Sequence, residues 1–326
     1  MKMNRMTLAA AIVMAFVSAW SFPQTPGTVK GGAPATTSAV RPFLGRWDLT
    51  LTAPDREYPS WLEIRLAEGK PAAEFVGRWG NARPLPKIEI HGAQITFVSR
   101  ADQEGRKDDM VFEGTLTGQK LAGSTTGPDG TPWKWVGVRA PSLKRTHAPE
   151  WGEPVKLFNG KDLTGWKMSK QGPPDWTVEA GNLIKPAESA ELISDRTFMD
   201  FKLHIEFNCG NEANSGVYLR GRYEVQIETE SQAESEVHHT GAIYGFIAPK
   251  PELPRSPDLW QTYDITLVGR RVTVIQNGTM VIDDQEIPGI TGGALSSHEE
   301  LPGPVYLQGS EKGEVRFRNI VITPAK

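Results

Sequence analysis

Apolar and polar residues alternate with a period of two along most of this chain, which is the pattern of β-strands that bury one face. In the region 41–140 the alternation comes in short runs separated by turn residues such as Asp129-Gly130. The predicted strands are 46–53, 61–67, 73–79, 87–91, 94–99, 110–116, 120–125 and 133–139. Short antiparallel strands in this number predict a small β-barrel or a strongly curved sheet.

A second alternating region covers residues 155–326 and contains no run with the period and length of a long helix. Its predicted strands are 176–178, 183–185, 200–208, 214–220, 223–228, 241–245, 260–268, 272–276, 279–284, 305–308 and 315–323. Many antiparallel strands without helices predict an all-β fold, here a two-sheet sandwich of the jelly-roll kind. Residues 141–154 are polar, rich in proline and without periodicity, so they are predicted to be a linker.

The N-terminus has the composition of a signal peptide. Lys2 and Arg5 supply positive charge, and the apolar run 6–17 has the length found in such peptides but is too short to span a bilayer. We predict cleavage at the end of residues 1–21, with a competing site after Ala19, and export to the periplasm or out of the cell. An uncleaved membrane anchor is the alternative, which the short apolar run disfavours.

Composition adds three expectations. Residues 22–40 are rich in Pro, Gly, Thr and Ala and predict a disordered leader. The net charge of -3 and the pI near 6.1 give no reason to expect nucleic acid or an anionic membrane as a partner. Cys209 is the only cysteine, so no internal disulfide can form, and we interpret it as a buried small residue rather than a nucleophile.

The stretch 214–228 carries the densest set of polar side chains on a predicted sheet face. It predicts two strands joined at Gly221-Arg222, with one apolar face that packs on a core. The opposite face holds Tyr218, Arg220, Glu224, Gln226 and Glu228, and the strand 305–308 adds Tyr306 and Gln308. These phenols, amides, carboxylates and the planar cation offer donors and acceptors to a hydroxyl-rich ligand. The alternative is a salt-bridged outer face that binds nothing.

The second region resembles the 3-keto-disaccharide hydrolase domain family, formerly a domain of unknown function. The resemblance spans about residues 155–324 and rests on ordered motifs at 158–166, 214–220, 223–227, 240–244, 303–308 and 317–320. It implies a concanavalin-like jelly roll in exported bacterial proteins. It also implies activity on sugars that are already oxidised at C3.

The implied chemistry assigns roles to the polar residues. A ketone at C3 acidifies the proton on C2, so a base can remove it and leave an enolate that expels the C1 substituent, after which water adds back. On this interpretation Arg220 stabilises the enolate and Glu224 transfers the proton, with His239 as the alternate. The expected substrate-binding residues, in one pocket roofed by the loops of His239 and Tyr244, are Tyr218, Gln226, Glu228, Tyr244 and Gln308. No cofactor is identified, and the use of a divalent metal stays open because no ligand spacing is diagnostic.

Two positions depart from the family pattern. Glu228 stands where the family commonly has Asp, and residues 310–313 stand where it often has Asp-His-Gly. His238 or His239 can substitute for the missing His, or both can be solvated loop residues. Three functions are therefore considered: an exported hydrolase acting on 3-keto-glycosides or 3-keto-disaccharides, a non-catalytic carbohydrate-binding protein, and a structural module. In each of the first two the partner is a small carbohydrate.

The first region has a resemblance of its own. Gly45-Arg46-Trp47 and Arg139 are similar to the lipocalin-type barrel pattern, in which a Trp of the first strand is covered by an Arg of the last. We therefore predict contact between Trp47 and Arg139. The tryptophans at 47, 61, 79, 133 and 135 are interpreted as core residues, and the alternative is that they line a ligand cavity.

Overall fold

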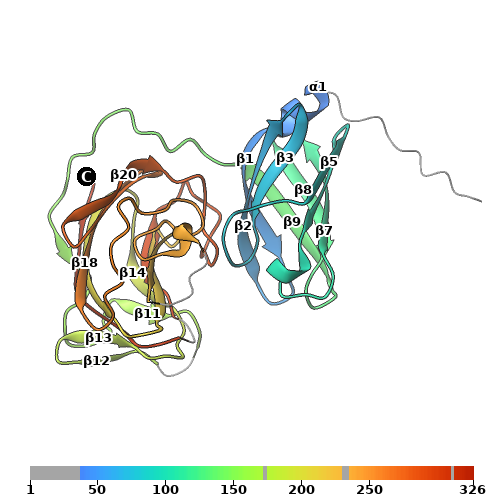
Figure 1. The fold of residues 1–326 in the computed structure, drawn as a ribbon. Coiled ribbons are helices and arrows are strands. Elements are labelled where there is room, and N and C mark those ends of the chain that lie inside the picture. The colour runs from blue at the N-terminus through green and yellow to red at the C-terminus, as the bar shows by residue number, and fades with distance from the viewer. Residues whose placement is uncertain (1–36, 172–174, 230–234, 310–311) are drawn as a thin grey trace, which may run out of the picture. The chain divides into compact units, whose positions relative to one another are not determined.

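The computed structural model of the protein, drawn in Figure 1, describes residues 37–171, 175–229, 235–309 and 312–326. The described residues belong to one compact unit. The predicted signal peptide and most of the predicted leader lie outside them and stay predictions. Within the described part, no helix combines the length and the apolar character needed to cross a membrane.

Antiparallel strands form the first sheet, in the order β4-β3-β2-β1-β9-β8-β7-β6-β5. Their bounds are β1 Gly45–Thr52, β2 Glu57–Ala67, β3 Lys70–Val76, β4 Arg83–Pro84, β5 Lys87–His91, β6 Gln94–Ser99, β7 Met110–Thr117, β8 Lys120–Thr126 and β9 Pro132–Arg139. The first strand pairs with β2 on one side and with the last strand, β9, on the other, which curls the sheet into a half-barrel. The predicted all-β character of this region is confirmed. The alternation missed β4 because a two-residue strand is too short to show a repeated pattern.

The predicted contact between Trp47 and Arg139 is confirmed. The two residues are direct neighbours in the β1–β9 ladder, and the guanidinium carbon of Arg139 lies 3.8 Å from the centre of the Trp47 ring. Arg139 also donates to the carbonyl oxygens of Leu44 and Pro42, and the Trp47 indole donates to the carbonyl of Phe43 at 2.8 Å. The Arg139 guanidinium thus links the residues that precede β1 to the end of strand β9.

The segment before β1 corrects one end of the predicted leader. Residues Thr37–Val40 form the short helix α1, and Arg41–Phe43 form the 3₁₀ turn η1. Val40 and Phe43 are fully buried in the core of the first sheet. The disordered leader was therefore predicted four residues too long, because a composition rich in small residues does not reveal that one valine inserts into a core.

Two further sheets form a β-sandwich, as predicted. The larger has the order β12-β13-β22-β15-β18-β19-β20, with β10 paired to β22, and the smaller has the order β11-β14-β21-β16-β17. The strands of the larger sheet are β10 Val155–Lys156, β12 Thr177–Glu179, β13 Asn182–Lys185, β15 Phe201–Cys209, β18 Trp260–Val268, β19 Arg271–Gln276, β20 Thr279–Glu286 and β22 Val315–Pro324. Those of the smaller sheet are β11 Trp166–Met168, β14 Leu192–Phe198, β16 Asn214–Leu219, β17 Tyr223–Glu228 and β21 Gly303–Leu307.

One buried cluster joins the two sheets of the sandwich. It contains Phe207 and Val274 from the larger sheet together with Val217, Val225 and Leu307 from the smaller one. On each strand these residues alternate with polar ones, so a period of two places one face on the shared core. The face of the smaller sheet that points away from this core is consequently left for polar chemistry.

The sandwich differs from the predicted elements at β10, β11, β14 and residues 241–245. The strands β10 and β11 have two and three residues and are too short to show an alternation. The pattern missed β14 because its register slips between Ile193 and Thr197, which breaks the alternation. The strand predicted at 241–245 is wrong: Ile243 makes isolated bridges to Val225 and Ile247, and glycines at both ends of this segment have positive φ angles that form turns.

Candidate active site

The outward face of the smaller sheet gathers polar side chains from three adjacent strands. In the β16–β17 ladder Tyr218 lies opposite Glu224, Gly216 opposite Gln226, and Asn214 opposite Glu228. On the other side of β16, Tyr306 of β21 lies opposite Tyr218, and their rings stack 4.0 Å apart. The backbone N–H of Gln308 donates to the backbone carbonyl of Gly216 at 2.9 Å, so Gln308 lies beside Gly216 on the same face of the sheet. This juxtaposition follows from the predicted alternation.

A cavity of about 140 Å³ opens over this face. It is lined by Trp79, Gly80, Asn214, Tyr218, Glu224, Gln226, Tyr244, Gly292, Gly293 and Gln308. Five of the residues proposed from the sequence are therefore together: Tyr218, Glu224, Gln226, Tyr244 and Gln308. Asn214 was not predicted as a lining residue, although it shares the alternation of Gly216 and Tyr218. The loop residues 79–80 and 292–293 were not predicted either, because no local pattern exists for them.

Glu224 contributes a carboxyl to the lining of the cavity. Its side chain is 2% exposed, and burial raises the pKa of its carboxyl to about 8, while the hydrogen bond from Tyr218 acts in the opposite direction. A pKa this far above the ordinary value means that the carboxyl carries a proton at neutral pH and can lose it with a modest change in its surroundings.

The contacts of Tyr218 agree with a protonated Glu224. The Tyr218 hydroxyl oxygen lies 2.8 Å from Glu224 Oε2 and 2.6 Å from the carbonyl oxygen of Gly292. Burial, followed by the nearby charge of Glu224, raises the pKa of the phenol well above its ordinary value, so it keeps its single proton. One proton serves one acceptor. If Tyr218 donates to Gly292, the second contact is a hydrogen bond only when Glu224 supplies the proton.

Side-chain amides complete the polar lining. In the orientation that satisfies its neighbours, the Gln226 amide nitrogen donates to Glu224 Oε1 at 3.2 Å and to the Ser215 carbonyl at 3.1 Å. Gln308 Oε1 is buried and meets no hydrogen-bond donor among the described residues. Since a buried acceptor without a donor is costly, Gln308 is suited to accept a hydrogen bond from a ligand hydroxyl.

The space for the Glu224 carboxyl depends on Gly216. A Cβ atom added at Gly216 would overlap Glu224 Oε1, and the glycine is buried in the middle of β16. We expect Gly216→Ala to displace the carboxyl and to lower turnover by about 100-fold, because a shift near 1 Å of a reacting group has an effect of this size. Steady-state kinetics together with urea unfolding will check this result. A folded variant with wild-type turnover would contradict the role given to this glycine.

Arg220 does not lie on the cavity, so this part of the sequence prediction is wrong. Strand β16 ends at Leu219, and Arg220 and Gly221 have φ angles of +53° and +64° in a two-residue turn closed by the Arg222 N–H on the Leu219 carbonyl. The turn rotates the Arg220 side chain onto the core side. There it donates to the Tyr223 hydroxyl at 2.7 Å and to Met199 Sδ at 3.0 Å. Its buried guanidinium supports the hairpin rather than an enolate.

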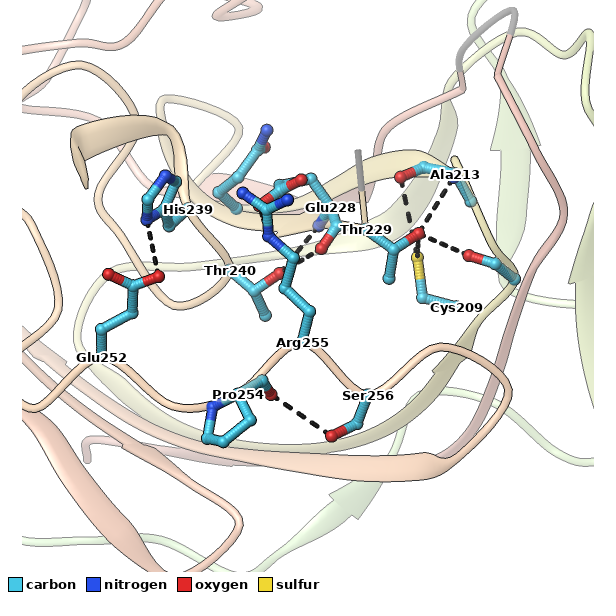
Figure 2. A network of polar contacts seen from close by, with 12 residues as sticks. Cys209, Ala213, Glu228, Thr229, His239, Thr240, Glu252, Pro254, Arg255 and Ser256 are labelled. Carbon is cyan, nitrogen blue, oxygen red and sulfur yellow. Dashed lines mark hydrogen bonds and ion pairs between the residues drawn. The ribbon is translucent and has the colours of Figure 1, made fainter. Parts of the chain in front are cut away.

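Glu228 and His239 belong to a polar network beside the cavity, shown in Figure 2. Glu228 Oε1 lies 3.4 Å from Arg255 Nε, and the Glu228 backbone is bonded to the Thr240 hydroxyl. His239 Nδ1 lies 2.9 Å from Glu252 Oε1. Neither residue lines the cavity, although both had been expected there. The loop itself does reach it, since Tyr244 is a lining residue whose ring stacks on that of His238, with ring centres 4.8 Å apart.

The remaining candidate groups are placed away from the cavity. Cys209 is a free, buried thiol, and burial raises its pKa to about 12, so it is not activated as a nucleophile. Across the described ranges, no group of three or more His, Cys, Asp and Glu side chains comes together as a metal site.

A buried carboxyl, phenols and amides thus line one cavity on the outward face of the smaller sheet of the β-sandwich. The chain belongs to the family of 3-keto-alpha-glucoside-1,2-lyase-like domains, whose family model matches residues 153–323. The resemblance noted in the sequence is thereby confirmed. No curated protein matches the chain.

Three solved structures, among others, are similar to this chain. One is a protein of Parabacteroides distasonis provisionally assigned as a glycosyl hydrolase, with 26% identity and a TM-score of 0.45, covering 57% of this chain and 96% of that one. Another protein of the same organism and assignment has 20% identity and a TM-score of 0.45, covering 53% and 94%. A carbohydrate binding module of Bacillus subtilis has 12% identity and a TM-score of 0.35, covering 48% and 93%.

Proposed function

We propose that this protein is an exported hydrolase that cleaves glycosides oxidised at C3 of one sugar ring, 3-keto-disaccharides among them. The observation that carries the proposal is the buried Glu224 carboxyl in the cavity, whose pKa of about 8 makes both of its protonation states accessible near neutral pH. The family supports the substrate class, because its name describes a lyase that acts across C1 and C2 of a 3-keto-glucoside, which is an elimination of the C1 substituent.

Glu224 moves one proton in this proposal. Its ionised carboxylate removes the proton from C2, and the electron pair of that C–H bond passes into an enolate spread over C2, C3 and the C3 oxygen. The enolate then forms the C1=C2 double bond and expels the C1 oxygen, which takes the same proton back from Glu224 and leaves as an alcohol. Water adds across the double bond, with oxygen at C1 and hydrogen at C2, so the net reaction is hydrolysis.

Neutral donors stabilise the enolate oxygen in the absence of Arg220. The amides of Asn214 and Gln308 line the cavity and carry N–H groups of the kind that hold developing oxyanions in other enzymes. Tyr218 keeps its proton and holds the Glu224 carboxyl at a fixed place. Because Tyr218 and Glu224 are buried, the contact between them is stronger than it would be in solvent.

The test uses matched sugars with the purified protein. We expect cleavage of 3-keto-trehalose and 3-keto-lactose type substrates, no cleavage of the unoxidised parent disaccharides, and a slower reaction when C2 carries deuterium. The last result separates C2 proton removal from direct glycosidic hydrolysis. Binding of these sugars without any product would reject the enzyme and favour the carbohydrate-binding alternative.

A further inference from the structure

Trp79 differs from the other tryptophans of the first sheet. It is 47% exposed, whereas Trp47, Trp61, Trp133 and Trp135 are buried, as the core interpretation predicted for all five. It lies in the loop between β3 and β4 and is a lining residue of the cavity that contains Glu224. An exposed Trp at the edge of a polar cavity presents a large, flat apolar ring to a ligand that enters the cavity.

The Trp79 ring is held in a fixed position from the protein side. It makes an edge contact with Tyr58 at 5.8 Å between ring centres, and Tyr58 in turn stacks on Trp133 at 5.5 Å. The guanidinium carbons of Arg56 and Arg78 lie 5.3 Å and 5.9 Å from the Trp79 ring centre. A ring fixed in this way loses little conformational entropy when a ligand stacks on it.

The backbone that follows Trp79 packs closely against two loops of the active site. A Cβ atom at Gly292 would overlap the Gly80 backbone, and one at Gly245 would overlap Asn81. Gly292 supplies the carbonyl that accepts from Tyr218, and Gly245 follows the lining residue Tyr244. Trp79 is therefore positioned by the same loops that position the Glu224 carboxyl.

The size of the cavity limits what it can enclose. Its volume of about 140 Å³ is well below the roughly 300–1,000 Å³ of pockets that bury a drug-sized ligand. One oxidised sugar ring can occupy the space over Glu224, but a disaccharide cannot be enclosed. The group attached at C1 must then lie at the mouth, where Trp79 stands.

We propose that Trp79 forms an outer subsite that stacks on the second sugar ring of the substrate, the ring that departs with the C1 oxygen. This inference rests on the proposed function. The C–H face of a pyranose is apolar, its hydroxyls point outward, and an indole ring offers a flat apolar surface of matching extent. The first sheet thus contributes, through Trp79, to the selection of the leaving group. The residue that transfers the proton, Glu224, belongs to the sandwich.

The experiment compares two substrates that share the 3-keto ring and differ in the leaving group. One is a 3-keto-trehalose type disaccharide and the other is methyl 3-keto-glucoside, which has no second ring. The proteins are the wild type, Trp79→Ala, Trp79→Phe and the matched control Val138→Ala, which shortens another exposed apolar side chain of the same sheet. We expect Trp79→Ala to lower kcat/KM about tenfold for the disaccharide and to leave that for the methyl glycoside within twofold.

The other variants complete the expectation. Trp79→Phe should recover most of the disaccharide activity because it keeps an aromatic face, and Val138→Ala should match the wild type on both substrates. Equal losses on both substrates, or no loss on either, would overturn the outer subsite while the proposed function stands. A wild type that cleaves neither substrate would overturn both, so the two failures can be told apart.

Discussion

Glu224→Gln should lower the turnover of a 3-keto-disaccharide by about 10²–10⁴-fold and leave the fold intact. The amide cannot accept the C2 proton, but it has the size of the protonated carboxyl and can donate to Tyr218 as that carboxyl does. A neutral side chain also suits a residue that is 2% exposed. Steady-state kinetics and far-ultraviolet circular dichroism of the same preparations will check both halves of this expectation.

The pH profile gives a second readout of the same residue. Since the ionised form of Glu224 removes the proton, kcat/KM of the wild type should rise about tenfold per pH unit below pH 8 and level off above it. The variant should lack this rise. A rate that instead falls as the pH passes through 8 would show that the protonated carboxyl starts the reaction.

Glu206→Gln is the matched control for this experiment. It makes the same chemical change on the larger sheet, where Glu206 pairs with Arg318 at 2.7 Å and lies outside the cavity. We expect it to keep wild-type turnover. Full activity in a folded Glu224→Gln protein would remove Glu224 from the mechanism.

Asp48→Asn should raise the free energy of unfolding by about 3 kcal/mol at pH 7, an unusual gain for a single substitution. Asp48 of β1 is buried, and neither of its carboxyl oxygens meets a hydrogen-bond donor in the described part of the chain. Burial first, and then the charge of Glu299, raise the pKa of Asp48 to about 9. Glu299 accepts hydrogen bonds from the Tyr223 hydroxyl at 2.6 Å and from Arg270 at 3.0 Å.

The stabilising effect should depend on pH in a defined direction. The pKa of Asp48 in the folded protein lies above its ordinary value of 3.8, so the folded state binds the proton more tightly than the unfolded chain does. The contribution of Asp48 to the free energy of unfolding of the wild type is fully present below about pH 4. It is lost as the pH rises through 9. Asparagine has no proton to lose, so the advantage of the variant should grow across the same interval.

Urea unfolding at pH 4, 7 and 9 will measure this difference. Asp102→Asn serves as the control, since Asp102 is an exposed residue of the same region that pairs with Arg100, and it should change little at any of these values. The prediction would be contradicted by a variant whose free energy of unfolding is below that of the wild type, or differs from it by the same amount at all three pH values. Either result would show that Asp48 is not held as a buried acid.

The two histidines illustrate a limit of reading motifs. The sequence placed His239 near the site because its loop contains family motifs, and the loop does reach the cavity through Tyr244. Which residue of a loop points inward depends on its turns and on the partners available. Here Glu252 lies 2.9 Å from His239, and the ring of His238 stacks on Tyr244.

The sequence by itself determined which side chains share a sheet face, because strand alternation is a local property. It therefore predicted the all-β fold and the grouping of Tyr218, Glu224, Gln226 and Gln308. It failed at Arg220, where a turn one residue earlier than predicted reversed the direction of a side chain. A shift of one residue is invisible to a period-two pattern once the strand has ended.

Only the tertiary structure decided how those side chains behave. The proton on Glu224 depends on burial and on the carbonyl of Gly292, which accepts from the Tyr218 hydroxyl although it lies 74 residues further along the chain. The exposure of Trp79, at the mouth of the same cavity, depends equally on loops that are distant in sequence. Solvent exclusion is a sum of contacts among remote segments, and it fixes the pKa of a carboxyl and the freedom of a ring in a way that no local pattern records.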